Sequence, residues 1–100
     1  MLFSEQINSV LKNSTEMCGR DFAAYLQSLD RDTLCKVQAF MYSGRDSISY
    51  ETYRNSPGMN QRETRWIVQS ISEKSGCLPK YFRNAEEKIK KEGMDINSLQ

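Results

Sequence analysis

The sequence predicts an all-α fold, a compact bundle of five or six helices around one central apolar helix. Apolar residues recur at steps of three and four in several stretches, which is the spacing of one helix face. Capping residues and glycines stand near the ends of these stretches. One hundred residues are enough for a single hydrophobic core and too few for two. We therefore expect one helical domain over residues 1–93 and a short polar tail over 94–100.

The best-marked helix is the central one, over residues 31–43. Asp30 can accept hydrogen bonds from the first turn, and Asp32 places negative charge near the positive end of the helix dipole. Gly44 is expected to end the helix in the left-handed conformation. The apolar positions of this helix are Leu34, Val37, Phe40 and Met41. Such a helix needs cover on most of its sides.

Two helices are expected before it. Residues 4–18 carry Ile7, Val10 and Leu11 at helical spacing, with Met17 and Cys18 continuing the stripe, Ser4 as the cap and Gly19 as the stop. Residues 20–29 form a shorter helix whose apolar positions are Phe22, Tyr25, Leu26 and Leu29.

The segment after the central helix has a weaker pattern. Ile48, Tyr50 and Tyr53 fit a short helix capped by Ser47 or Ser49, and they also fit an extended segment; we favour the helix. Asn-Ser-Pro-Gly at residues 55–58 is a turn sequence, so whatever precedes it ends there.

Two further helices follow the turn. Residues 61–75 begin after Asn60, a cap with Glu63 as its capping-box partner, and their inner face is expected to be Trp66, Ile67 and Ile71. Residues 79–92 begin at Pro79 and end before Gly93. The tail is expected to fray unless Met94, Ile96 and Leu99 dock on the core. The predicted core consists of Leu11, Leu26, Leu34, Val37, Phe40, Met41, Ile67, Ile71, Phe82 and Ile89.

The residue types disfavour an enzyme. There is no histidine, which removes the commonest proton shuttle and the commonest metal ligand. Cys18, Cys35 and Cys77 are far apart, a spacing that predicts reduced thiols, with Cys77 the one most expected to be exposed. No glycine-rich phosphate loop is present. We expect no catalytic residues, no cofactor and no metal.

Charge and hydropathy limit the classes of partner and the cellular compartment that we expect. The net charge of +1 gives no overall attraction to nucleic acid or to anionic membranes. The N-terminal residues lack a secretion-signal pattern and the apolar runs are short, so we expect a cytoplasmic protein without a membrane segment. Residues 51–100 hold nine basic and seven acidic side chains, among several aromatic ones. Nucleic-acid binding by this half is therefore the second hypothesis.

The first hypothesis is a non-catalytic protein-interaction domain, namely a small adaptor, regulator or inhibitor, with a homodimer also allowed. Its predicted partner-binding edge is Arg45, Asp46, Tyr50 and Tyr53, because tyrosine and arginine are among the residue types that dominate protein contacts. The same side chains also fit a satellite cluster that covers the central helix. That structural alternative is favoured over the functional one.

Residues 34–46 also resemble a known group of proteins. The segment Val-Gln-Ala-Phe-Met-Tyr-Ser-Gly-Arg-Asp at residues 37–46 is similar to the core segment of a bacterial family of uncharacterised small helical proteins, in which an apolar helix ends in a Gly-Arg motif. The turn at residues 55–58 and the charged last helix depart from that pattern. The resemblance implies an all-helical bacterial domain and carries no catalytic residues.

Overall fold

The computed structural model describes all 100 residues, Met1–Gln100. It contains seven α-helices, two short 3-10 helices and no strand, which confirms the all-α prediction. The α-helices are α1 (Phe3–Glu16), α2 (Gly19–Gln27), α3 (Arg31–Arg45), α4 (Tyr50–Arg54), α5 (Pro57–Asn60), α6 (Thr64–Ser72) and α7 (Leu78–Lys91). The 3-10 helices are η1 (Ser75–Cys77) and η2 (Ile96–Ser98). None of these helices has the length and apolar character that crossing a bilayer requires.

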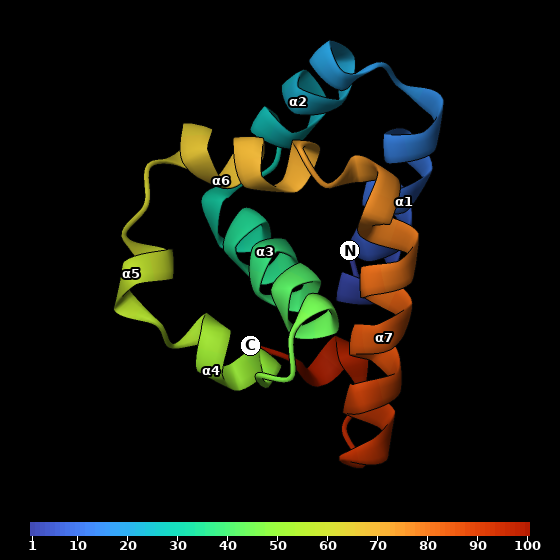
Figure 1. Cartoon of the computed structure of the whole chain (residues 1–100), viewed down its shortest axis with the longest axis vertical. Coiled ribbons are helices and arrows are strands. Elements are labelled where there is room, and N and C mark those ends of the chain that lie inside the picture. Colours follow the sequence, from blue (N-terminus) through green and yellow to red (C-terminus); the bar gives the residue numbers. More distant parts are fainter.

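Helix α3 is the centre of the fold, as predicted. It runs through the middle of the molecule, with α7 along one side, α6 near its start and α4 near its end (Figure 1). Every residue from Thr33 to Gly44 except Lys36 is buried. Helix α1 reaches α3 through Phe3, whose ring packs edge-on against Phe40 with the centroids 5.6 Å apart. A helix that is apolar over most of its surface is stable only when neighbouring elements cover it, and the other helices do so here.

The start of α3 is fixed by two polar residues. The Asp30 carboxylate accepts the Thr33 N–H at 2.7 Å, which confirms Asp30 as the cap and lowers the pKa of its carboxyl group. The Arg31 guanidinium donates to the backbone carbonyls of Asn60 and Arg62. It thereby attaches the connection between α5 and α6 to the beginning of α3.

Gly44 was predicted as a left-handed helix stop, and that prediction is wrong. Helix α3 continues through Gly44 to Arg45, and Gly93 is the one residue with a positive φ, 74°. A Cβ on Gly44 would lie 1.7 Å from the carbonyl oxygen of Tyr81 and 2.6 Å from its carbonyl carbon. Glycine is needed here because the backbones of α3 and α7 approach each other closely. Gly93 does end α7 as expected.

Two predicted helix starts are also wrong. Helix α1 begins one residue before Ser4 and ends at Glu16, so Met17 and Cys18 are exposed and Gly19 begins α2. Asn60 ends α5 instead of capping α6, which begins at Thr64. The Asn60 side-chain amide donates to the Arg54 carbonyl at 2.6 Å, so its polar group holds α4 to α5.

The short connecting elements follow the favoured predictions more closely. Helix α4 forms behind Ser49, whose hydroxyl accepts the Thr52 N–H at 3.3 Å, and it ends before the predicted turn. Pro57 then starts the single turn of α5. The tail is the exception, because it was expected to fray and instead follows the alternative of docking on the core: Leu99 is buried and the Asn97 side chain accepts the Ser4 N–H at 2.9 Å. All predicted core residues except the half-buried Leu11 are buried.

One buried polar group in α3 lacks a partner. Gln38 is 1% exposed, and its side-chain Nε2 has no hydrogen-bond partner. A buried donor without an acceptor costs about 1–3 kcal/mol. The substitution Gln38→Met keeps the shape of the side chain and removes this donor, so we expect the free energy of unfolding to rise by about 1 kcal/mol in a denaturant titration. A decrease instead would mean that the amide is satisfied.

Candidate functional site

The exposed indole of Trp66 is the most distinctive surface feature. Its side chain is 48% exposed, whereas Ile67 and Ile71 of the same helix are fully buried. The expectation that Trp66 lies on the inner face of α6 is therefore wrong. Val68 completes that face instead. The sequence already indicated this orientation. At 100° per residue, Val68 and Ile71 lie on one side of Ile67 around the helix axis and Trp66 lies on the opposite side.

Two arginine side chains lie near Trp66, Arg65 at its ring and Arg62 in the hollow that it lines. The Arg65 guanidinium carbon lies 5.3 Å from the centroid of a Trp66 ring, and Arg65 Nε forms an ion pair of 2.9 Å with Glu63. Trp66 also lines a hollow of about 440 Å³ on the surface. Its lining residues are Arg62, Trp66, Gln69, Ser70 and Glu73. An aromatic ring and a guanidinium thus border the same depression.

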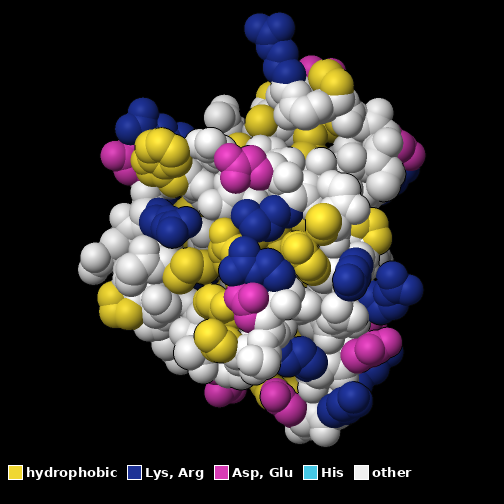
Figure 2. All heavy atoms as spheres, in the orientation of Figure 1, with side chains coloured by type: hydrophobic (Ala, Val, Ile, Leu, Met, Phe, Trp, Pro, Cys, Tyr) yellow, Lys and Arg dark blue, Asp and Glu magenta, His cyan; other side chains and the backbone are white.

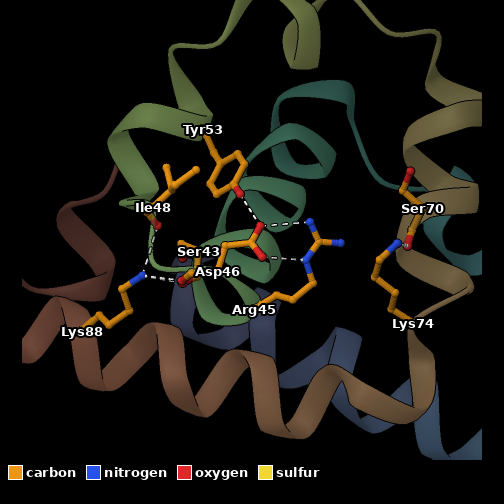
Figure 3. Close-up of polar contacts among 8 residues, drawn as sticks. All are labelled: Ser43, Arg45, Asp46, Ile48, Tyr53, Ser70, Lys74 and Lys88. Carbon is orange, nitrogen blue, oxygen red and sulfur yellow. Dashed lines mark hydrogen bonds and ion pairs between the residues drawn. The ribbon is translucent and has the colours of Figure 1, made fainter.

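A second group of side chains surrounds the end of α3. Arg45 forms a two-pronged pair with Asp46, with Nε 3.1 Å from Oδ1 and Nη2 2.9 Å from Oδ2 (Figure 3). The Tyr53 hydroxyl donates to the same carboxylate. The Arg45 guanidinium carbon lies 4.4 Å from the ring centroid of Tyr42, and Lys74 Nζ lies 5.2 Å from that centroid. We call Tyr42, Arg45, Asp46, Tyr53 and Lys74 the α3-end cluster.

Within the α3-end cluster, Arg45, Asp46 and Tyr53 satisfy one another, whereas Lys74 adds a positive charge without an acidic partner. Hydrogen bonds from Arg45, and then from Tyr53, lower the pKa of the Asp46 carboxyl group. The bond to Asp46 raises the pKa of Arg45, and burial followed by the bond to Asp46 raises the pKa of Tyr53. At neutral pH the cluster therefore holds a charged Arg45–Asp46 pair and a neutral Tyr53.

The α3-end cluster and the Trp66 hollow belong to one surface. Lys74 Nζ donates to the Ser70 carbonyl at 3.1 Å, and Ser70 lines the hollow (Figure 3). Basic side chains stand beside exposed hydrophobic atoms in the middle of this side of the molecule, with acidic side chains next to them (Figure 2). We call this surface the α3–α6 face; it comprises the α3-end cluster together with Arg62, Arg65, Trp66 and Ser70.

Of the four residues in the predicted edge, the structure brings three together. Arg45, Asp46 and Tyr53 are in contact, and the Tyr53 ring lies 5.7 Å from that of Tyr42, centroid to centroid. Tyr50 is 6% exposed and does not join them, because it packs into the core and donates its hydroxyl to the Gln100 carbonyl at 3.1 Å. Tyr50 therefore presents almost no surface to a partner.

The buried Tyr50 makes the protein sensitive to alkali. Burial is the main cause that raises the pKa of Tyr50 from its ordinary value of 10.0 to about 12. The unfolded chain loses this proton near pH 10 and the folded chain only near pH 12, so the stability contribution is complete below pH 10 and is lost between these values. We expect a loss of about 1.4 kcal/mol per pH unit in that window. Denaturant titrations of Tyr50→Phe should lack this component; an identical alkaline slope would contradict the assignment.

The structure also places the cysteines and acidic groups. Cys35 is buried, and Cys18 and Cys77 are exposed. No three cysteine, aspartate or glutamate side chains are grouped closely enough to hold a metal ion. The chemistry that the α3–α6 face offers is aromatic and guanidinium contact.

Comparison of the chain with protein-family models, with curated proteins and with solved structures gives no match. The resemblance of residues 34–46 to a bacterial family therefore stays a prediction. The function is inferred from the α3–α6 face alone.

Proposed function

We propose that this protein is a non-catalytic protein-interaction domain that works as a small adaptor, regulator or inhibitor through its α3–α6 face. The observation that carries the proposal is the exposure of Trp66 beside Arg65 and at a hollow that Arg62 also lines. The few residues that supply most of the binding energy in protein interfaces are enriched in tryptophan, tyrosine and arginine. When a partner covers a half-exposed indole, a large apolar surface is removed from water, and this burial favours binding.

The contacts around the α3–α6 face also support binding without a large rearrangement. Arg45, Asp46 and Tyr53 hold one another in place, and Lys74 is attached to Ser70. Side chains that are already ordered lose less entropy when a partner binds. Because Arg45 and Asp46 neutralise each other, a partner that covers this pair does not have to supply a charge to it, and Lys74 is the charge of the cluster that has no acidic partner.

The partner can be captured with a photoreactive amino acid at position 66, using position 87 as the control. Glu87 is exposed on α7 and lies outside the α3–α6 face. The proposal expects a protein cross-linked from position 66 and not from position 87. The affinity of that protein is then measured for variants of the chain.

The substitution Trp66→Ala is expected to weaken binding of the captured partner by about 30-fold, since an interface hot spot contributes about 2 kcal/mol or more. The fold should be unchanged because the side chain is half exposed. Met17→Ala is the matched control, another exposed apolar side chain at the end of α1. Unchanged affinity in Trp66→Ala, Arg45→Ala and Tyr53→Ala would exclude the α3–α6 face.

Nucleic-acid binding is the second candidate, and the same tryptophan supports it. Proteins that bind single strands stack bases on aromatic rings beside arginine; here Arg65 lies at the Trp66 ring and Arg62 lines the same hollow as Trp66. The affinity for a labelled single-stranded oligonucleotide would then fall linearly, on logarithmic axes, as salt is added. A partner protein bound mainly through Trp66 would show a much weaker salt dependence.

A further inference from the structure

Lys74 carries the positive charge of the α3-end cluster that no carboxylate neutralises. Its Nζ donates a hydrogen to the Ser70 carbonyl at 3.1 Å and lies 5.2 Å from the centroid of the Tyr42 ring. No aspartate or glutamate lies within ion-pair distance of it. An ammonium group has three hydrogens to donate, so two of them have no acceptor within the chain.

Arg45 places a second cation beside the same ring. Its guanidinium carbon lies 4.4 Å from the Tyr42 centroid, and its Nε and Nη2 are bound to Asp46. The remaining guanidinium nitrogen has no partner in the chain, and Figure 3 shows it directed to the side on which Lys74 lies. A carboxylate has two oxygens and can accept from both cations, whereas the Asp46 carboxylate is already bound by Arg45 and Tyr53.

The Lys74 ammonium also lies next to the Trp66 hollow. Ser70, whose carbonyl accepts from Lys74, follows Trp66 by four residues in α6 and lines the same hollow. Four residues of an α-helix rise about 6 Å, so the indole and this carbonyl are about one turn apart. One short segment of a partner can therefore place an apolar side chain against Trp66 and an acidic side chain on Lys74.

The other charges of this surface favour a single carboxylate over a polyanion. Asp46, Glu63 and Glu73 place three carboxylates on or beside the α3–α6 face. A nucleic-acid strand carries a negative charge at every nucleotide, and a strand stacked on Trp66 would bring its phosphates near Glu63 and Glu73. One acidic side chain directed at Lys74 avoids that repulsion.

We propose that the partner protein docks on the α3–α6 face through a short segment with an apolar side chain for the Trp66 hollow and an aspartate or glutamate for Lys74 and Arg45. This inference rests on the proposed function and names the chemistry of the partner. Hydrogen bonds between charged groups are about twice as strong as neutral ones. Because Ser70 and Asp46 already hold the two cations in place, little further order is needed to bind the carboxylate.

The test is selection of a random peptide library, displayed on phage, against the immobilised protein. We expect the selected peptides to share an acidic residue close to an apolar one and to lose binding to Trp66→Ala. For such a peptide, Lys74→Met should weaken binding by about tenfold in fluorescence polarisation, whereas Lys74→Arg keeps the charge and should bind nearly as the wild type does. Lys91→Met removes an exposed lysine of α7 outside the α3–α6 face and should leave the affinity unchanged.

A second measurement shows whether the acidic residue of the peptide contacts Lys74. Replacing that residue by its amide should weaken binding to the wild type by about tenfold and binding to Lys74→Met by almost nothing, because contacting residues are not additive. Equal losses in the two proteins would overturn the inference. Unchanged affinity of the original peptide for Lys74→Met would overturn it as well.

The outcome also separates this inference from the proposed function. Peptides that need Trp66 but share no acidic residue would overturn the inference and leave the interaction domain in place. If no selected peptide depends on Trp66, the inference is wrong, and cross-linking from position 66 decides the proposed function separately. Tighter binding of a single-stranded oligonucleotide than of any selected peptide would show that the face prefers phosphates, which also overturns the inference.

Discussion

Gly44→Ala is expected to lower the free energy of unfolding by about 3 kcal/mol, at the upper end of the range for overpacked cores. The added Cβ would lie 1.7 Å from the Tyr81 carbonyl oxygen, and the third nearest atom, the Ala85 nitrogen, is 3.1 Å away. All of these atoms belong to the backbone of α7, so no side chain can rotate to make room. The two helices must separate, although alanine itself favours a helix by about 1 kcal/mol over glycine.

Gly19→Ala is the matched control for this experiment. Gly19 is the first residue of α2, and a Cβ at that position would meet nothing within 4 Å. We expect its stability to equal or slightly exceed that of the wild type, because alanine restricts the unfolded chain. Denaturant titrations of both variants give the comparison. Equal stabilities would show that α3 and α7 do not pack as closely as described.

The central helix could be predicted because its signals are local. Asp30 caps the chain three residues before the amide that it binds, and the apolar residues of α3 are spaced within one helix. The role of Gly44 could not be predicted in this way. A glycine near the end of an apolar helix fits both a stop and a close helix crossing, and only the position of Tyr81 on α7 decides between them.

In the candidate site too, contacts between sequence neighbours could be predicted, whereas burial that depends on distant elements could not. The pair of Arg45 and Asp46 is adjacent in sequence, and its place at the end of α3 was expected. Tyr50 was expected beside Tyr53, but the docking of Leu99 and Gln100 over α4 buries it. Trp66 was placed inside because it is apolar, although the rotation of α6 that buries Ile67 and Val68 turns the indole outward.

The end of α3 depends most strongly on a residue far away in the sequence. The last carbonyls of a helix lack partners within the helix, and two side chains of α7 supply them here. Asn84 donates to the Gly44 carbonyl at 3.3 Å, and Lys88 donates to the Ser43 carbonyl and to two carbonyls of the following loop. These contacts join residues at least 40 positions apart, so the charged pattern of α7 gave no sign of them.

Lys88→Met is therefore expected to lower the free energy of unfolding by about 3 kcal/mol. The substitution keeps most of the carbon chain and removes three bonds from a charged donor, and a hydrogen bond to a charged group contributes about 1.5–3 kcal/mol. The ammonium also lies at the negative end of the α3 dipole. The loss is limited because Lys88 is half-buried and the Ile48 carbonyl is exposed to water.

Lys90→Met is the control, since Lys90 is exposed on the same helix and forms only a surface pair of 3.4 Å with Glu86. Such a pair contributes at most about 1 kcal/mol. Hydrogen exchange gives a second readout, because the freed loop after α3 should exchange faster at residues 46–49 in Lys88→Met alone. Equal losses in the two variants would mean that Lys88 acts as an ordinary surface charge. A larger loss in Lys88→Met, with faster exchange in that loop, would establish that α7 holds the end of α3 and with it the position of Asp46 on the α3–α6 face.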